Sequence, residues 1–218
     1  MLNGVWALVP VKDFQDSKQR LGGAVSAAMR RRLAEAMFRD VLNTLTTVRH
    51  IERIAVITKD RQAVNIATEI NAFVIHESEN QGETRAVGQA TDVLVRLGVR
   101  TMLVVPGDIP FITKEDVETV LRAGCIADVV LVPAHDERGT NAVLLTPPGI
   151  LPLRFGNDSF RPHFESAQAL KVRVTVLHLP NIALDVDTPA DLAALARWPD
   201  RTPRTRTHIL LEEAQRKN

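Results

Sequence analysis

The chain has 218 residues, of which 45% are apolar, and this size and composition suit one folded α/β domain and argue against intrinsic disorder. Its 27 basic and 26 acidic side chains nearly cancel, so no overall field would attract a polyanion. Only 4% of the residues are aromatic and none is tyrosine, which argues against a base-stacking surface for single-stranded nucleic acid. Nucleic acid is therefore not an expected partner.

Cysteine usage and hydropathy predict where the protein works. The single cysteine, Cys125, can form neither an internal disulfide nor a cysteine-based zinc site, which indicates a reducing compartment. The first apolar stretch reaches a charge after about ten residues and lacks the basic start of a signal peptide. No apolar run approaches the ~20 residues of a membrane span. We expect a soluble, cytoplasmic protein without a membrane partner.

Apolar, β-branched runs alternate along the chain with longer segments of helical periodicity. The runs that predict strands are 5–11, 53–58, 72–77, 101–108, 127–133, 141–147 and 172–180. The segments that predict helices are 26–48, 61–70, 83–98 and 113–124. Ser26 is a candidate N-cap, and Thr113 with Asp116 forms a capping-box-like start for the last helix, which ends at Gly124.

This alternation predicts the fold class and the domain organisation. Strand, helix and strand in repetition indicate an α/β fold with a mostly parallel sheet between helices, a three-layer α/β/α arrangement. Several predicted strands are apolar throughout, as expected when both faces are covered. We expect one domain over residues 1–198. The charged, proline-punctuated residues 199–218 then form a tail or a short packing helix.

The first loop concentrates positive charge. Lys12, Lys18 and Arg20 lie just past the first predicted strand, in the segment VPVKDFQDSKQRL. Cations at the carboxyl end of a parallel strand suit a polyphosphate. Neither a Walker loop nor a G-x-G-x-x-G pattern is present, which argues against P-loop and dinucleotide-binding enzymes. A solvated basic loop without function would look similar.

Two further segments place acids beyond predicted strands. Asp108 ends the apolar run MLVVPGD, and Asp185 and Asp187 follow later in LDVDTP. Being two residues apart, Asp185 and Asp187 face the same way in an extended segment. Carboxylates at two strand ends could hold a Mg²⁺ ion that bridges substrate phosphates. The alternative is that Asp185 or Asp187 merely caps the helix that Thr188 and Pro189 start.

Two polar loops complete the candidate site. The loop VPAHDERGTNAVLL offers the short hydrogen-bonding side chains of Thr140 and Asn141, although a plain hairpin turn would look similar. The segment FGNDSFRPHFESA adds Gly156, Ser159 and His163. Ser159 is a candidate helix N-cap, and the free N–H groups there suit an anion. No metal partner is suitably spaced from His163, so we expect an anion contact or a packed histidine.

Five segments, taken in order, resemble the 2-phospho-L-lactate guanylyltransferase family of coenzyme F-420 biosynthesis. They are VPVKDFQDSKQRL, VPGDIP, VPAHDERGTNAVLL, FGNDSFRPHFESA and LDVDTPADL, and they span residues 5 to about 195. The resemblance implies a single-domain nucleotidyltransferase fold of the glycosyltransferase-A-like type. It also implies Mg²⁺-dependent transfer of GMP from GTP, with release of pyrophosphate. The implied acceptor is a small phosphorylated acid: 2-phospholactate, phosphoenolpyruvate or 3-phosphoglycerate.

The resemblance also implies residue roles at the matching positions. The implied ligands of the GTP phosphates are Lys12, Lys18 and Arg20, with Gly82 beside the nucleoside. The implied Mg²⁺ ligands are Asp108 and Asp187, and the catalytic groups are Lys18 and Asp108. The implied contacts to the phosphorylated acid are Thr140, Gly156 and Ser159, with His163 nearby.

One departure from the family and two rival functions leave questions open. Glu83 and Thr84 stand where the family has Leu and Asn, beside the nucleoside. The resemblance therefore does not determine how strictly the protein prefers guanine over other bases. A sibling transferase for a sugar phosphate or a pterin cofactor usually begins with a glycine-rich loop, whereas this chain has no glycine there before Gly22. A non-catalytic nucleotide-binding protein would not need both acids. The C-terminal tail is a candidate surface for a homo-oligomer.

Overall fold

A seven-stranded sheet forms the centre of the protein. The structure is a computed structural model that describes residues 2, 4–77, 82–156, 158–196, 198 and 204–215. The strands are β1 (Val5–Pro10), β2 (Ile51–Thr58), β3 (Phe73–His76), β4 (Thr101–Val104), β5 (Val129–Pro133), β6 (Thr140–Leu145) and β7 (Val174–Val176). Their order is β3-β2-β1-β4-β6-β5-β7, and β6 is the one strand among them that runs antiparallel to its neighbours. The expected mostly parallel α/β sheet is confirmed.

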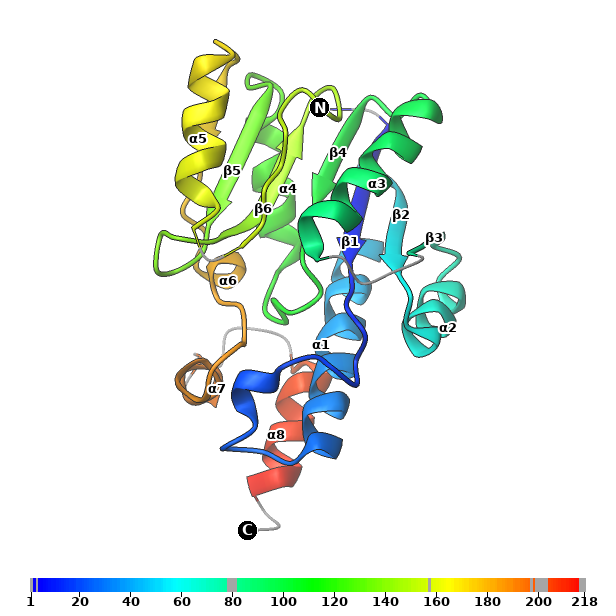
Figure 1. Cartoon of the computed structure of the whole chain (residues 1–218), viewed down its shortest axis with the longest axis vertical. Coiled ribbons are helices and arrows are strands. Elements are labelled where there is room, and N and C mark those ends of the chain that lie inside the picture. Colours follow the sequence, from blue (N-terminus) through cyan, green and yellow to red (C-terminus); the bar gives the residue numbers. More distant parts are fainter. Residues whose placement is uncertain are drawn as a thin grey trace.

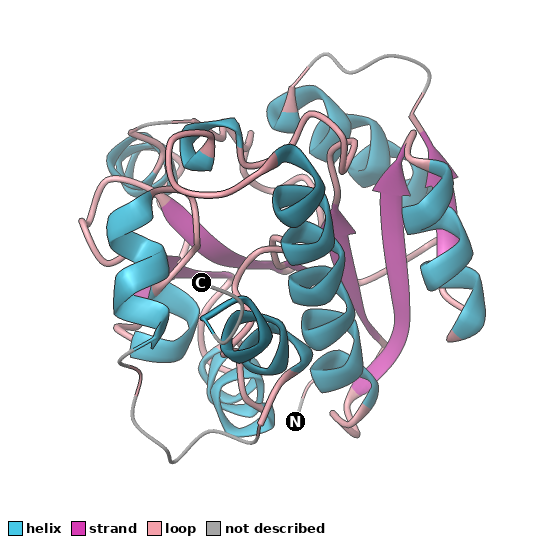
Figure 2. Ribbon diagram, turned by 90° about the horizontal axis from the view of Figure 1, so that it is seen from below, coloured by secondary structure: helices cyan, strands magenta, loops and turns pink. Residues whose placement is uncertain are grey.

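Helices cover both faces of this sheet (Figures 1 and 2). One face packs against α1 (Ala27–Thr46), α2 (Arg61–Glu69) and α4 (Lys114–Ala123), and the other against α3 (Glu83–Arg96) and α5 (Phe160–Ala169). Side chains of β1 alternate between the two cores, with Ala7 and Val9 in one and Leu8 in the other. Because both faces of β1 are buried, its sequence is apolar throughout instead of alternating.

The predicted helix starts are confirmed in detail. The hydroxyl of Ser26 accepts a hydrogen bond from the N–H of Met29 at the start of α1. Thr113 and Asp116 bond reciprocally to each other's backbone N–H groups, which completes a capping box at α4. These bonds satisfy donors that a helix start leaves unpaired.

Two strands are shorter than their apolar runs. β4 ends at Val104, whereas its run extends to Asp108, because Pro106 has no N–H for a further ladder bond. Asp108 therefore lies in a turn beyond the strand. β7 is confined to Val174–Val176, and Pro180 starts the short helix α6 (Pro180–Ala183), which is too brief to show a helical period.

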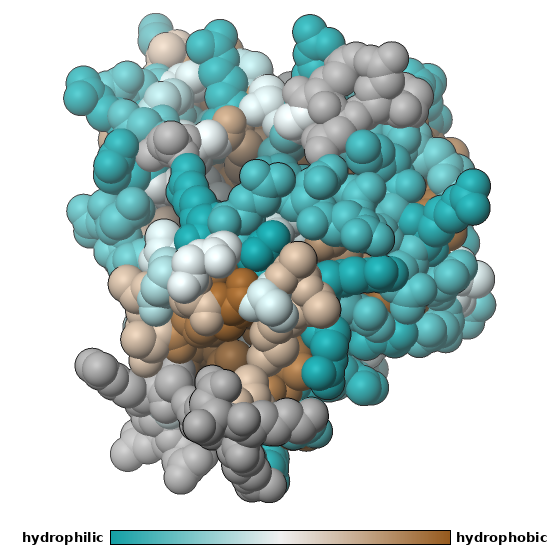
Figure 3. Space-filling view, turned by 60° about the horizontal axis from the view of Figure 1, so that its bottom comes forward, coloured by the Kyte–Doolittle hydropathy of each residue, from teal (hydrophilic) through white to brown (hydrophobic). Residues whose placement is uncertain are grey.

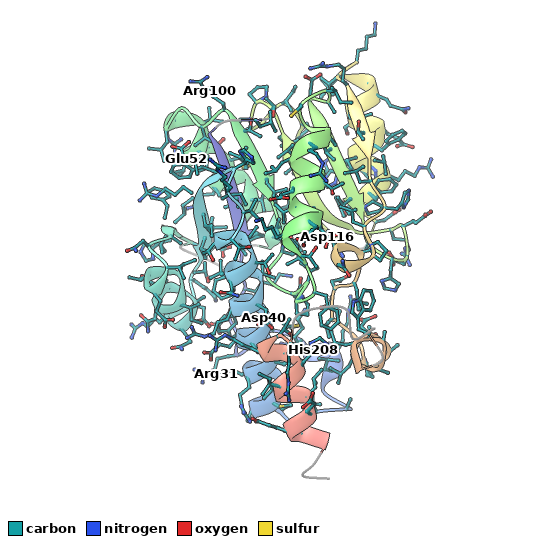
Figure 4. The ribbon with its side chains drawn as sticks, turned by 180° about the vertical axis from the view of Figure 1, so that it is seen from behind. Arg31, Asp40, Glu52, Arg100, Asp116 and His208 are labelled. Carbon is teal, nitrogen blue, oxygen red and sulfur yellow. The ribbon has the colours of Figure 1, made fainter. Side chains whose placement is uncertain are left out.

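The C-terminal part of the chain packs beneath the sheet. Helices α7 (Pro189–Ala196) and α8 (Arg206–Gln215) join the lower half of α1 in a third apolar cluster, and Figure 1 shows α8 alongside α1. Asp40 of α1 accepts hydrogen bonds from the N–H groups of Arg206 and Thr207, 2.9 Å each, and so caps α8 (Figure 4). The predicted boundary after residue 198 adjoins 199–203, which lie outside the described residues. Among the described helices, none is long and apolar enough to cross a membrane.

Candidate active site

A cavity of about 880 Å³ opens at the edge of the sheet where the parallel strands end. Its wall contains all but one of the predicted site residues: Lys12, Lys18, Arg20, Gly82, Asp108, Thr140, Gly156, Ser159 and Asp187. The exception is His163, which is buried behind the wall with 1% of its surface exposed. Antiparallel β6 contributes through its first residue, Thr140, because its start lies at the edge where the neighbouring parallel strands end. Figure 3 shows the lower face of the molecule, with hydrophilic residues over its upper part and apolar residues gathered below its centre.

The first loop is fixed by a carboxylate from outside it. Asp60 is the N-cap of α2 and accepts hydrogen bonds from the N–H of Ala63, in the first turn of that helix, and from the N–H of Phe14, both at 2.9 Å. The loop then turns at Lys18, which has φ 56° and ψ 33°. This left-handed conformation is unfavourable for a residue with a Cβ, and such strain is concentrated at functional sites. The turn directs the Lys18 side chain into the cavity.

The ammonium of Lys18 joins two acids from distant loops. Its Nζ donates to Asp108 Oδ2 at 2.6 Å and to Asp187 Oδ1 at 2.8 Å, and the side chain is only 6% exposed. Burial alone would lower the pKa of Lys18, but the two carboxylates outweigh it and raise that pKa above its ordinary value. Burial likewise would raise the pKa of Asp187, yet Lys18 holds it below its usual range. Lys18 and Asp187 are therefore both charged at neutral pH.

Asp185 and Asp187 both line the cavity. Leu184, before them, and Val186, between them, are buried, as expected from alternation in an extended segment. Neither acid caps α7. The cap is Thr188, whose hydroxyl accepts from the N–H of Asp191, and the Asp191 carboxylate accepts from the N–H of Thr188 in return. The alternative that Asp185 or Asp187 merely caps this helix is therefore excluded.

A buried asparagine holds the segment that carries these acids. The Nδ2 group of Asn141 donates to the carbonyls of Ile182 and Ala183 and to Asp185 Oδ1, at 3.0 to 3.1 Å. Burial, followed by the charge of Asp108, raises the pKa of Asp185 despite the bond from Asn141. Sequence reasoning noticed Asn141 only as a polar loop residue, because nothing local shows which segment it would meet.

Glu83 is a cavity residue to which sequence reasoning gave no role of its own. It is the first residue of α3, directly after Gly82, whose φ of 91° belongs to the left-handed region that favours glycine. Burial raises the pKa of Glu83 to about 7; Lys12 opposes the shift, and Asp108 and Asp187 add to it. The departure of this position from the family pattern was the available signal.

Thr84 clamps the start of α3 to the loop before α5. Its hydroxyl donates to the carbonyl of Phe155 at 3.1 Å and accepts from the N–H of Phe155 at 2.9 Å. The next residue, Gly156, lines the cavity. The nucleoside side and the predicted acceptor side of the cavity are thus joined by one threonine.

The hydroxyls of Thr140 and Ser159 lie 3.2 Å apart on the cavity wall. Ser159 occupies the N-cap position of α5, as expected, but its side chain makes no capping bond and donates to Thr140 instead. The His163 ring lies behind Thr140, with Nδ1 at 3.0 Å from the threonine Oγ1. Of the two roles considered for His163, the packed position is the one observed.

The acidic side chains can be compared with the needs of a metal ion. No group of three or more His, Cys, Asp or Glu side chains in the described ranges is arranged to hold a metal. Mg²⁺, however, commonly takes one or two carboxylates and fills its other positions with water and substrate phosphates. Asp108 and Asp187 already converge on one cation, the Lys18 ammonium. This donor set fits a Mg²⁺ ion that arrives together with phosphates.

Comparison with known proteins identifies a family for this chain. The profile of the family described as "Guanylyl transferase CofC like" matches residues 5–202, which include the whole cavity wall. The chain belongs to this family. The family resemblance expected from the five ordered segments is confirmed.

Relatives in the family carry three different names. The phosphoenolpyruvate guanylyltransferase of Conexibacter woesei is 37% identical over 192 residues, 87% of this chain and 86% of the relative. The 2-phospho-L-lactate guanylyltransferase of Methanothermobacter thermautotrophicus is 34% identical over 189 residues, covering 87% and 82%. The 3-phospho-D-glycerate guanylyltransferase of Colwellia psychrerythraea is 34% identical over 190 residues, covering 87% and 90%.

Solved structures confirm the fold. A protein from Desulfovibrio desulfuricans G20, described as a nucleotide-diphospho-sugar transferase, superposes with a TM-score of 0.82 over 99% of this chain and 96% of the other. Its sequence is 20% identical, so the likeness establishes the α/β nucleotidyltransferase type of fold and not the substrate.

Proposed function

We propose that the protein is a Mg²⁺-dependent guanylyltransferase that transfers GMP from GTP to the phosphate of a small phosphorylated acid and releases pyrophosphate. The observation that carries this proposal is the meeting of two halves of a site in one cavity. The paired acids Asp108 and Asp187 line the same cavity as the hydroxyls of Thr140 and Ser159. Membership of the guanylyl transferase family supports the reaction class.

The charges on the cavity wall suit two anionic substrates. Lys12, Arg20 and Arg138 are exposed side chains that line the cavity, and Lys18 adds a fourth positive charge. Oriented cations bind phosphates and stabilise the charge that develops during phosphoryl transfer. GTP as the donor is supported by membership of the guanylyl transferase family and by the relatives, which are named guanylyltransferases.

The expected chemistry needs alignment more than proton transfer. An oxygen of the acceptor phosphate attacks the α-phosphorus of GTP and forms the new P–O bond. The bond between the α-phosphorus and the oxygen bridging to the β-phosphate breaks, and pyrophosphate leaves with that electron pair. The attacking oxygen is already anionic near neutral pH, so no strong general base is required. This agrees with a wall that is rich in Lys, Arg and Asp.

The residues that would hold Mg²⁺ are Asp108 and Asp187. When bound, the ion would neutralise phosphate charge as a Lewis acid. The protein's own part is to hold the two carboxylates at a fixed distance from Lys18, which also lowers the pKa of Asp187. Positioning of both substrates by the wall supplies the remaining rate enhancement.

The acceptor carries both a carboxylate and a phosphate in our proposal, as phosphoenolpyruvate, 2-phospholactate and 3-phosphoglycerate do. The relatives named for these three acids differ by only three percentage points in identity to this chain, which does not select among them. We place the reaction in coenzyme F-420 biosynthesis, in the cytoplasm, as the family resemblance and the single cysteine imply.

Pyrophosphate release by the purified protein with Mg²⁺ tests the proposal. GTP, ATP and CTP are each combined with 2-phospholactate, phosphoenolpyruvate, 3-phosphoglycerate and glucose 1-phosphate. Release with GTP and one phosphorylated acid is the expected result, and it names the acceptor. Release with glucose 1-phosphate alone would point to a sibling transferase, and nucleotide binding without any release would point to a binding protein.

Two variants locate the activity in this cavity. Asp108→Asn keeps the size of the side chain and removes its charge, and we expect turnover to fall by about 100-fold or more. Asp92→Asn is the matched control, because Asp92 is exposed on α3 away from the cavity wall. Equal activity in both variants would contradict the site.

A further inference from the structure

His163 is a buried polar residue that the proposed reaction does not use. It lies one turn into α5 with 1% of its surface exposed, and its ring packs edge-on against Phe155 at 5.5 Å. Both ring nitrogens nevertheless have hydrogen-bond partners. The direction of those bonds can be worked out from the groups involved.

The backbone fixes which nitrogen of the ring carries the proton. The N–H of Arg154 points to His163 Nε2 at 2.8 Å, and a backbone N–H can only donate. Nε2 must therefore be the acceptor and carry no proton. In a neutral ring the proton is then on Nδ1, and the Nδ1–H group donates to Thr140 Oγ1 at 3.0 Å. Burial lowers the pKa of His163 to about 4, so the ring is neutral at physiological pH.

The hydrogen-bond partners of Thr140 likewise determine the direction in which its hydroxyl can donate. Its oxygen accepts from His163 Nδ1 and from the hydroxyl of Ser159, which uses both of its lone pairs. The threonine proton has to point elsewhere, and no residue of the described chain accepts it. Thr140 lines the cavity, so this proton is available to a bound molecule. A hydroxyl that could have been donor or acceptor is left only as a donor.

We propose that His163 is a positioning residue that, as the Nδ1–H tautomer, commits the hydroxyl of Thr140 to donating a hydrogen bond to an anionic oxygen of the acceptor acid. The assignment of the ligand rests on the proposed function. The tautomer itself rests only on the hydrogen bonds that His163 makes with Arg154 and Thr140. The result is a site that favours a hydrogen-bond acceptor, and disfavours a donor, at this point of the phosphorylated acid.

Nuclear magnetic resonance of protein labelled with ¹⁵N-histidine tests the tautomer without substrates. His163 is one of six histidines, and its signals are identified by their loss in His163→Asn. Should that variant not fold, the buried ring is recognised as the one that stays neutral at pH 5.5. We expect a protonated Nδ1 and an unprotonated Nε2 at pH 7. A protonated Nε2, or a charged ring, would overturn the proposal.

Three substitutions separate the two hydrogen bonds of the ring. Asparagine can place an amide N–H near the position of Nδ1, so His163→Asn keeps a donor to Thr140. His163→Gln can place its carbonyl near the position of Nε2, which keeps the partner of Arg154 and removes that donor. His163→Phe removes both. We expect the KM of the phosphorylated acid to rise about 10- to 100-fold in the Gln and Phe variants and far less in the Asn variant.

The KM of GTP should stay unchanged in all three variants, because His163 does not face the cavity. In a Thr140→Val background, His163→Gln should have no further effect on the KM of the acid, because the hydroxyl that it orients is gone. Equal rises in the Asn and Gln variants, or additive effects with Thr140→Val, would show a merely structural histidine. A wild-type protein that transfers no GMP would refute the proposed function, and the tautomer measurement would still stand.

Discussion

The Lys18 ammonium lies 2.6 Å from a carboxylate oxygen of Asp108, a residue 90 positions later in the chain. The same ammonium also reaches Asp187, so one cation holds together the two loops that carry the proposed metal ligands. The acids of this site are pre-assembled by a protein cation, and their mutual repulsion is already neutralised. Lys18 therefore contributes to the shape of the site as well as to its charge.

Replacing Lys18 with methionine should lower GMP transfer by about 100-fold or more, because a buried cation is lost from a site of charge transfer. Its effect on stability should depend on pH. The pKa of Asp187 is lowered in the folded protein, so its pairing stabilises the fold above the unfolded value of 3.8 and this contribution fades as pH falls below it. Thermal melting at pH 7.5 and at pH 3.5 measures this.

Lys114→Met is the matched control, since that side chain is 45% exposed and makes only a 3.8 Å ion pair. We expect full activity and an unchanged melting temperature. A Lys18→Met protein that transferred GMP at the wild-type rate would show that Lys18 is only structural.

Glu83→Gln should change how stability varies with pH. The folded pKa of Glu83 is raised from 4.5 to about 7, so the folded protein holds this proton where the unfolded chain has released it. The stability of the wild type therefore falls between about pH 4.5 and pH 7 by a contribution that Gln does not have. Denaturant unfolding at pH 5 and pH 8 should show the variant gaining relative to the wild type at pH 8.

The same substitution should affect GTP binding. Above pH 7 the ionised Glu83 repels the phosphates, and we expect the KM of GTP to rise with pH in the wild type and less in the Gln variant. Identical pH profiles in both proteins would show that Glu83 does not face the nucleotide. Asp92→Asn provides the control for the loss of one surface carboxylate.

Thr84→Val removes the clamp between α3 and the loop that precedes α5. Valine has a similar size, but it leaves both the N–H and the carbonyl of Phe155 without their partner. We expect a loss of about 1–3 kcal/mol in unfolding free energy and a several-fold higher KM for the phosphorylated acid, because Gly156 is next in the chain. Thr84→Ser keeps the hydroxyl and should restore most of both; a Ser variant as impaired as Val would argue against the clamp.

Asp40→Ala tests how the C-terminal helix is held. The Asp40 carboxylate accepts from two N–H groups at the start of α8 and from the hydroxyl of Thr207. Loss of a cap costs about 1–2 kcal/mol, which corresponds to about 2–8 °C in melting temperature for a chain of this size. Activity at 25 °C should be unchanged, because Asp40 is not one of the residues that line the cavity. Lost activity at that temperature would mean that α8 supports the site.

Local sequence was sufficient for most of the elements and for several site residues. Both helix starts that were singled out, at Ser26 and at Thr113, depend on bonds three residues apart, within reach of any local pattern. The alternation that puts Asp185 and Asp187 on one side depends only on an extended backbone. The mostly parallel sheet followed from strands and helices in alternation.

Sequence by itself thus determined the fold class, the family and nine of the residues that line the cavity. The tertiary structure alone decided their relationships: Lys18 paired with Asp108 and Asp187, Thr84 bonded to Phe155 across 71 positions, and His163 buried behind Thr140. The raised pKa of Glu83 also depends on charges from other loops. The physical reason is that periodicity and capping act within a few residues, whereas burial and charge pairing depend on which loops the order of the strands brings to one edge of the sheet.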